Sequence, residues 1–289
     1  MFASDQYELI DFGQGRKLER FGPYLLDRPC PAASGLPCQE ASLWRAAHAR
    51  YERLPGASTS QGRGHWSCAK RLPDSWMIHH GRICLELKLA PFGHVGVFPE
   101  QAQNWDWLAA QVRRAPRPPK VLNLFAYTGG STLAAADAGA EVVHIDAARN
   151  VVAWARRNAE RSGLADRPIR WIPEDAVKFV RREVRRGKRY DAVILDPPSY
   201  GHGPKGEVWK IERHLQPLLG LCAKLVRGRP AFMLLTCHTS RLQPAALETC
   251  FADAVFRCRR SDIRSHRLVL RSSAGGRELP SGVVVRWPS

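Results

Sequence analysis

Short apolar runs alternate with helical patterns from Val121 onward, and this alternation limits the possible folds more than any other feature of the chain. The first run, Val121–Phe125, has the apolar character expected of a strand that is buried on both faces of a sheet. Strands that alternate with helices build an open, mainly parallel α/β sheet with helices on both faces. The predicted strands span residues 121–125, 141–145, 169–172, 192–195 and 231–236.

The chain after the fifth predicted strand has a different pattern. Residues 263–270 and 283–287 are the last two predicted strands, and we expect them to form an antiparallel pair at the end of the chain. In an open α/β sheet the ligand binds outside the carboxyl ends of the strands, near the point where the strand order reverses. The residues that follow each predicted strand are therefore the candidates for a site.

A glycine-containing turn follows the first predicted strand. Thr128-Gly129-Gly130 leads from that strand into a helix of small residues, and glycine permits close backbone approach to a ligand. The Gly-x-Gly-x-x-Gly pattern that seats a dinucleotide pyrophosphate is absent. The turn therefore disfavours NAD and favours a smaller adenosyl ligand without phosphates; an ordinary tight turn is the alternative.

Two acidic residues follow the next two predicted strands. Asp146 lies 17 residues beyond Gly129 (146 − 129), where a carboxylate can accept both ribose hydroxyls of a nucleoside. Asp175 is placed where an acid could accept a hydrogen from an adenine amino group. Each could also cap a helix N-terminus, and for Asp175 both roles are compatible.

Asp196-Pro197-Pro198-Ser199-Tyr200 directly follows the fourth predicted strand. Two consecutive prolines restrict φ, so they hold the Asp196 carboxylate and the Pro197 carbonyl in one direction. Such a pair of acceptors can bind an exocyclic amino group, while an aromatic side chain stacks on a flipped base. A strand that simply ends at prolines is the alternative.

This set of motifs resembles the class I S-adenosylmethionine-dependent methyltransferases. More narrowly, it is similar to bacterial 23S ribosomal RNA base methyltransferases in which a small N-terminal module precedes a Rossmann-like catalytic fold. His94–Gln101 is similar to the short signature before that fold, whereas Met1–Ala115 does not resemble the PUA domain that usually comes first. The resemblance implies S-adenosyl-L-methionine as the cofactor. Cofactor binding is expected at Asn123, Phe125, Ala126, Tyr127, Thr128, Gly129, Gly130, Asp146, Asp175, Ala176 and Asp196.

The acceptor atom depends on two further positions. In the amino-methylating families an aromatic residue follows Pro-Pro directly, whereas here Ser199 intervenes before Tyr200. Cys237 follows the fifth predicted strand, and a thiolate there could add to C6 of cytosine and activate C5. A buried, inert cysteine is the alternative. The predicted catalytic residues are Asp196, Pro197, Pro198, Tyr200 and Cys237, and the acceptor is cytosine C5 or a purine nitrogen.

The charge of the chain predicts a polyanionic partner. The formal net charge is +17, with 14 basic and 11 acidic residues through Ala115 (+3) and 30 and 16 after it (+14). A basic protein of this kind is expected to bind RNA, here ribosomal RNA. Only 9 of the 44 basic residues are lysine, so an arginine-favouring codon bias is an alternative explanation. Methylation of a protein or small molecule, and RNA binding without catalysis, remain open.

Pro116-Arg117-Pro118-Pro119 predicts a boundary between a small N-terminal α+β module, residues 1–115, and a methyltransferase domain, residues 116–289. The module is expected to help bind the substrate. Hairpins are predicted around 13–15 and 80–82, with a helix over 41–54 between them.

Several classes of protein are disfavoured. No apolar run approaches the ~20 residues of a membrane span, and the N-terminus lacks the pattern of a signal peptide. The eight cysteines never form Cys-x-x-Cys, and no histidine pair has metal-ligand spacing. We therefore expect a cytoplasmic protein with free thiols and no metal site.

Overall fold

The computed structural model describes residues 1–54, 64–202, 208–226, 231–239, 241–256 and 261–289. The chain forms two compact units. The first consists of Met1–Ala102 and Val269–Ser281, and the second of Gln103–Leu268 and Gly282–Ser289. The change from one unit to the other at Ala102 precedes the proline-rich segment at 116–119, where we expected the boundary.

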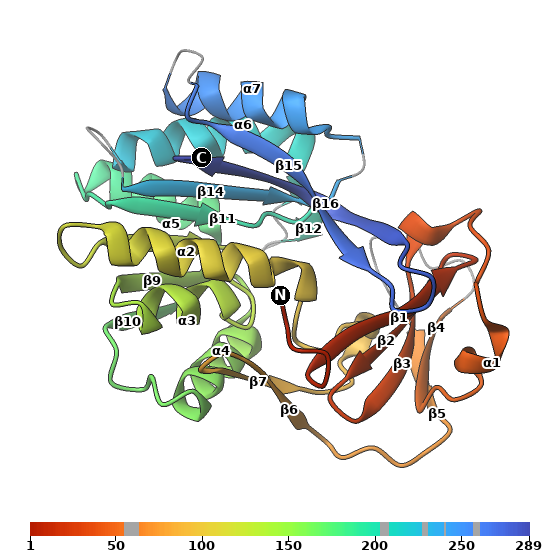
Figure 1. Cartoon of the computed structure of the whole chain (residues 1–289). Coiled ribbons are helices and arrows are strands. Elements are labelled where there is room, and N and C mark those ends of the chain that lie inside the picture. Colours follow the sequence, from red (N-terminus) through yellow and green to blue (C-terminus); the bar gives the residue numbers. More distant parts are fainter. Residues whose placement is uncertain (55–63, 203–207, 227–230, 240, 257–260) are drawn as a thin grey trace. The chain divides into compact units, whose positions relative to one another are not determined.

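A seven-stranded sheet forms the centre of the second unit, with strand order β10-β9-β8-β11-β14-β16-β15 (Figure 1). Neighbouring strands from β10 to β14 are parallel, and β16 is antiparallel to β14. The predicted α/β class is therefore confirmed, including the antiparallel C-terminal hairpin. The strands are β8 (Lys120–Leu124), β9 (Glu141–Asp146), β10 (Ile169–Pro173), β11 (Ala192–Leu195), β14 (Phe232–Cys237), β15 (Arg264–Arg271) and β16 (Glu278–Trp287).

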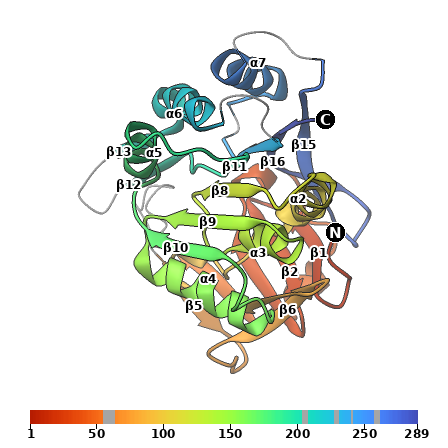
Figure 2. The ribbon, with the colours of Figure 1, turned by 90° about the vertical axis from the view of Figure 1, so that its left-hand side faces the viewer.

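Helices cover both faces of this sheet, as Figure 2 shows. On one face, Leu122, Val193 and Leu235 pack with the buried sides of α5 (Ala176–Arg185), α6 (Ile211–Leu225) and α7 (Pro244–Val255). On the other face, Val121, Ile194 and Phe232 pack with α2 (Ala102–Arg114) and α3 (Gly130–Asp137). α4 (Arg149–Arg161) packs against β9 and β10. Because both faces are covered, the central strands β8, β11 and β14 are buried along nearly their whole length.

Two helices differ from the sequence-based expectation. α2 was not predicted, although Trp105, Leu108 and Val112 follow the i, i+3, i+7 spacing of a buried helix face. The helix predicted over 208–226 begins at Ile211, because Val208–Lys210 forms β13, which pairs with β12 (Tyr200–His202).

The first unit is rich in β-structure. β1 (Tyr7–Gly13), β2 (Arg16–Phe21), β3 (Tyr24–Pro29), β4 (Ala49–Arg53) and β5 (Gly64–Cys68) form one sheet, and β6 (Trp76–His80) pairs with β7 (Ile83–Leu87). Both predicted hairpins are present. The remaining elements are α1 (Ala41–Trp44) and the short 3-10 turns Pro31–Ala33, Pro91–Gly93 and Pro99–Gln101.

The helix predicted over 41–54 is wrong. Only Ala41–Trp44 is helical, and Ala49–Arg53 is a strand that runs parallel to β3 and antiparallel to β5. Ala49 and Tyr51 are buried, while Arg50 and Glu52 point to solvent, so the strand alternation decides the conformation.

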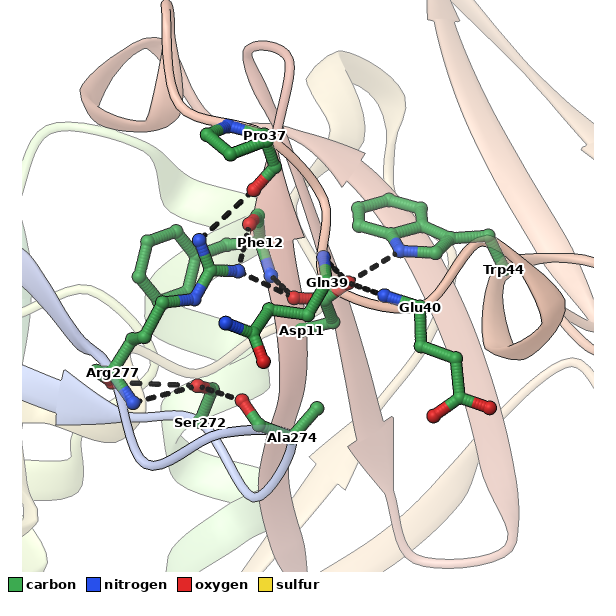
Figure 3. Close-up of polar contacts among 9 residues, drawn as sticks. All are labelled: Asp11, Phe12, Pro37, Gln39, Glu40, Trp44, Ser272, Ala274 and Arg277. Carbon is green, nitrogen blue, oxygen red and sulfur yellow. Dashed lines mark hydrogen bonds and ion pairs between the residues drawn. The ribbon is translucent and has the colours of Figure 1, made fainter.

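A buried ionic cluster joins the two chain segments of the first unit (Figure 3). Asp11 is fully buried and accepts hydrogen bonds from the indole of Trp44 (2.8 Å) and from Nη2 of Arg277 (2.7 Å). The Arg277 guanidinium also donates to the carbonyl of Phe12 (2.6 Å) and lies over the Phe12 ring. Burial raises the pKa of Asp11, but hydrogen bonds from Trp44, Phe12, Glu40 and Gln39 lower it below 3.8.

Within the described residues, none of the helices is both long and apolar enough to span a membrane. In the same residues, no three His, Cys, Asp or Glu side chains gather in a way that could hold a metal ion. Cysteines 30, 38, 68, 84, 222, 237 and 250 are not joined in disulfides, and Cys258 lies outside the described residues.

Candidate active site

The predicted site residues gather at one edge of the second unit's sheet. Since β8, β9, β10, β11 and β14 are parallel, their carboxyl ends lie at the same edge. The glycine turn follows β8, Asp146 ends β9, Asp175 follows β10, Asp196 follows β11, and Cys237 ends β14. The topology thus brings together residues that are more than 100 positions apart in the chain.

The turn after β8 has an unusual backbone. Phe125 (φ 57°), Tyr127 (φ 48°) and Gly129 (φ 94°) adopt left-handed conformations. Non-glycine residues in this region cost about 1–3 kcal/mol each and persist only where the surroundings impose them. The Ala126 N–H donates to the Ile145 carbonyl (3.0 Å), and the Gly129 N–H donates to the Ala126 carbonyl (3.0 Å). The turn is therefore held in a fixed, strained conformation beside the end of β9.

Gly130 has a packing role that its sequence context did not reveal. A Cβ atom at this position would lie 2.3 Å from the Trp105 ring of α2. Gly129 instead supplies the left-handed N-cap of α3. The second glycine therefore allows an indole to pack on the start of the helix, while the first turns the chain.

A buried polar network supports the turn from inside the unit. Asn123 is 1% exposed, and its amide donates to Oγ1 of Thr132 (2.9 Å), which lies 2.9 Å from Nδ1 of His144. Burial lowers the pKa of His144 to about 3, so its ring is neutral. Asn158 donates to the Thr128 carbonyl (2.9 Å). The structure thus places Asn123 in the interior beneath the turn.

Asp146 is oriented by the backbone on both sides. Its Oδ2 accepts the N–H of Tyr127 (2.9 Å) and its Oδ1 accepts the N–H of Ala148 (2.9 Å). A carboxylate oxygen accepts two hydrogen bonds, so each oxygen can also accept a ribose hydroxyl. Burial raises the pKa of Asp146 above 3.8, although the N–H groups of Ala148 and Tyr127 act in the opposite direction. This preorganised carboxylate fits an adenosyl cofactor.

The raised pKa of Asp146 predicts pH-dependent cofactor binding. If the ionised carboxylate accepts both ribose hydroxyls, as predicted, affinity should fall as the pH drops through this pKa, beginning at a higher pH than for an ordinary aspartate. Asp146→Asn should weaken S-adenosylmethionine binding about 10- to 100-fold and remove this pH dependence. Calorimetry across the acidic range measures both effects.

The matched control is Asp166→Asn, which changes an exposed carboxylate between α4 and β10. A raised folded-state pKa means that the ionised Asp146 lowers stability at neutral pH, so Asp146→Asn should remain folded. Wild-type affinity that stays constant with pH would contradict the assignment.

Asp175 caps α5, since its carboxylate accepts the N–H of Lys178 (2.8 Å). The capping role is therefore confirmed, and contact with adenine stays a prediction. Ala176 is the first residue of α5 and is 4% exposed.

Side chains from the end of β14 hold the loop that begins at Asp196. Oδ1 of Asp196 accepts the Thr236 hydroxyl and lies 3.3 Å from Nε2 of His238. The Ser199 and Thr239 hydroxyls are 2.6 Å apart. Sequence patterns missed these contacts, although three polar side chains within Thr236–Thr239 were a signal.

The prolines and the tyrosine of this loop differ in exposure. Pro197 is buried, Pro198 is exposed, and the Pro198 carbonyl accepts the indole N–H of Trp209 (2.6 Å). The Trp209 ring also lies 5.1 Å from the Phe125 ring, which connects the loop to the turn after β8. Tyr200 is exposed on β12, opposite Lys210 of β13.

Cys237 lies at this edge but is almost inaccessible. It is 1% exposed. Burial raises the pKa of its thiol, and the nearby carboxylates of Asp196 and Glu212 raise it further, against hydrogen bonds from Thr239. This environment disfavours the thiolate that attack on cytosine C6 requires.

Comparison with known proteins agrees with this geometry. Residues 37–241 match the family described as S-adenosylmethionine-dependent methyltransferase. A solved methyltransferase from Agrobacterium tumefaciens is 36% identical, with a TM-score of 0.88 over 98% of this chain and 90% of that one. Ribosomal RNA large subunit methyltransferase I of Aeromonas salmonicida is 33% identical over 54% of this chain and 38% of its own length.

Ribosomal RNA large subunit methyltransferase K of Neisseria meningitidis is 30% identical over 37% of this chain and 31% of its own length. The chain thus spans between three and four tenths of these two curated relatives. The family match and the solved structure, by contrast, extend over most of this chain. The convergent strand ends and these similarities lead to one conclusion: the chain belongs to the S-adenosylmethionine-dependent methyltransferase family.

Proposed function

We propose that this methyltransferase modifies a base of 23S ribosomal RNA in the cytoplasm. The observation that carries the proposal is the position of the Asp196 loop beside the turn after β8, connected by the Trp209 contacts with Pro198 and Phe125. The names of the curated relatives and the net charge of +17 favour RNA as the substrate.

The residues at this edge have separate tasks in the proposed reaction. Asp146 would accept the ribose hydroxyls of S-adenosylmethionine, which supplies the methyl group when bound. Asp196 would accept a hydrogen bond from the target base and so orient it, since positioning supplies much of the rate of such a transfer. Tyr200 is exposed and could stack on a flipped base.

The burial of Cys237 supports a nitrogen acceptor over cytosine C5. Cys237→Ala is expected to keep turnover within about threefold of wild type, since a buried thiol with a raised pKa is a poor nucleophile. Initial rates on ribosomal RNA from cells that lack the protein measure this. Cys222→Ala, at another buried thiol, controls for lost packing. If Cys237→Ala loses turnover and Cys222→Ala does not, the acceptor is cytosine C5 and Cys237 is the nucleophile.

Binding to RNA provides the test of the substrate class. Exposed arginines on α4 and α5, including Arg156, Arg181 and Arg185, would contact phosphates. A filter-binding assay with ribosomal RNA should show an affinity that falls steeply with salt. Mass spectrometry of ribosomal RNA nucleosides with and without the protein then identifies the modified base. If the ribosomal RNA nucleosides are the same with and without the protein, the acceptor is a protein or a small molecule instead.

A further inference from the structure

His238 lies directly beyond β14, next to the carboxylate that the proposed reaction uses. Its Nε2 is 3.3 Å from Oδ1 of Asp196, and the two side chains are similarly exposed, at 29% and 28%. Thr236 donates its hydroxyl to the same oxygen. Two side chains on either side of Cys237 in the sequence therefore reach one carboxylate oxygen.

A glycine on the neighbouring strand leaves space for the imidazole. Gly282 of β16 has φ 137°, and a Cβ atom there would lie 2.9 Å from Nδ1 and 3.3 Å from Cε1 of His238. Any larger residue at 282 would therefore have to displace the ring. The imidazole thus has Asp196 near one nitrogen and the Gly282 backbone near the other.

We propose that His238 is a positioning residue that sets the direction of the Asp196 carboxylate, with Gly282 keeping the space that its ring needs. The inference rests on the proposed function of Asp196. Oδ1 takes one hydroxyl donor from Thr236 and one ring nitrogen from His238, so both contacts restrict rotation of the carboxylate. Restricting it fixes where its second oxygen points, and that direction decides how a base amino group is held.

Thr236 and His238 would restrain the Asp196 carboxylate in different ways. Thr236 is fully buried and anchors the carboxylate from within the strand. His238 is partly exposed and acts from the side that solvent reaches. Because His238 would act through Asp196, its loss should slow turnover without changing how the cofactor binds.

The experiment compares His238→Ala, His238→Gln and the control His266→Gln, which changes an exposed histidine on β15. With ribosomal RNA from cells that lack the protein, His238→Ala should lower kcat about 10²-fold. The KM and Kd for S-adenosylmethionine should stay within about twofold in all three variants. His238→Gln keeps an N–H donor and should recover at least about tenfold of the lost kcat. Full kcat in His238→Ala, or equal loss in both His238 variants, would overturn the proposal.

A second measurement needs neither cofactor nor RNA. Imidazole nitrogen chemical shifts of His238 should change in Asp196→Asn and in Gly282→Ala, while those of His266 should not. If the chemical shifts of His238 do not change in Asp196→Asn, the contact between His238 and Asp196 is refuted. If wild-type protein methylates no ribosomal RNA, the proposed function fails, and the chemical shifts still decide whether His238 is coupled to Asp196.

Discussion

Asp196→Ala is expected to lower turnover by at least about 10²-fold, the loss that misplacing a reacting group can cause. The carboxylate lies at the end of β11, is oriented by Thr236 and His238, and stands beside the turn that is expected to hold the cofactor. In the proposed reaction, the substitution would remove the acceptor that orients the target base. Methylation rates at saturating cofactor measure the effect.

Cofactor affinity separates this catalytic role from loss of structure. Calorimetry should show that Asp196→Ala still binds S-adenosylmethionine, and circular dichroism should show an unchanged fold. Asp166→Ala removes an exposed carboxylate elsewhere in the same unit and should keep full activity. An active Asp196→Ala enzyme would remove this residue from the mechanism.

Arg277→Ala is expected to lower the free energy of unfolding of the protein by about 3 kcal/mol. The substitution leaves the fully buried Asp11 carboxylate without its cationic partner, and it also removes a donor to the carbonyls of Phe12 and Pro37. Leaving a buried charge without its partner lowers the free energy of unfolding by several kcal/mol, whereas an exposed ion pair contributes about 1 kcal/mol or less. Urea denaturation at neutral pH measures the difference.

The control for this effect is Arg271→Ala. Arg271 pairs with Glu278 in the same C-terminal segment, but both side chains are exposed, at 70% and 51%. Arg271→Ala should therefore lower the free energy of unfolding by less than about 1 kcal/mol. Equal destabilisation by the two substitutions would show that the buried Asp11 cluster contributes no more to stability than an exposed ion pair.

Acid provides a second test of the same cluster. Hydrogen bonds hold the pKa of Asp11 below its ordinary value of 3.8, so its stabilising contribution is complete above that value. The contribution is lost as the pH falls through the lowered folded-state pKa. The stability difference between wild type and Arg277→Ala should therefore narrow in strong acid.

Much of the candidate site could be predicted because its signals are local. Each strand of the parallel sheet contains a short apolar run, and the residue that follows a strand lies at the carboxyl edge of the sheet. Gly129, Asp146, Asp175 and Asp196 were found in this way. The cap formed by Asp175 is also local, since it joins residues three positions apart.

Contacts between distant segments could not be predicted. The space that Gly282 leaves for His238, and the indole of Trp105 on Gly130, join positions that no local pattern relates. The misplaced helix at 41–54 has a similar cause. Local preferences there favour a helix, but pairing of Ala49 with Leu26 on β3 and Cys68 on β5 prevails.

Periodicity and the residues at strand ends are properties of short stretches, so the amino-acid order alone specified the class of fold and the edge where the site lies. The roles of individual side chains depend on burial and on neighbours from other strands. The structure alone revealed that Asn123 is interior, that Cys237 is a shielded thiol, and that His238 faces Asp196. Burial changes the free energy of a charged or nucleophilic group, and burial is a property of the packed chain.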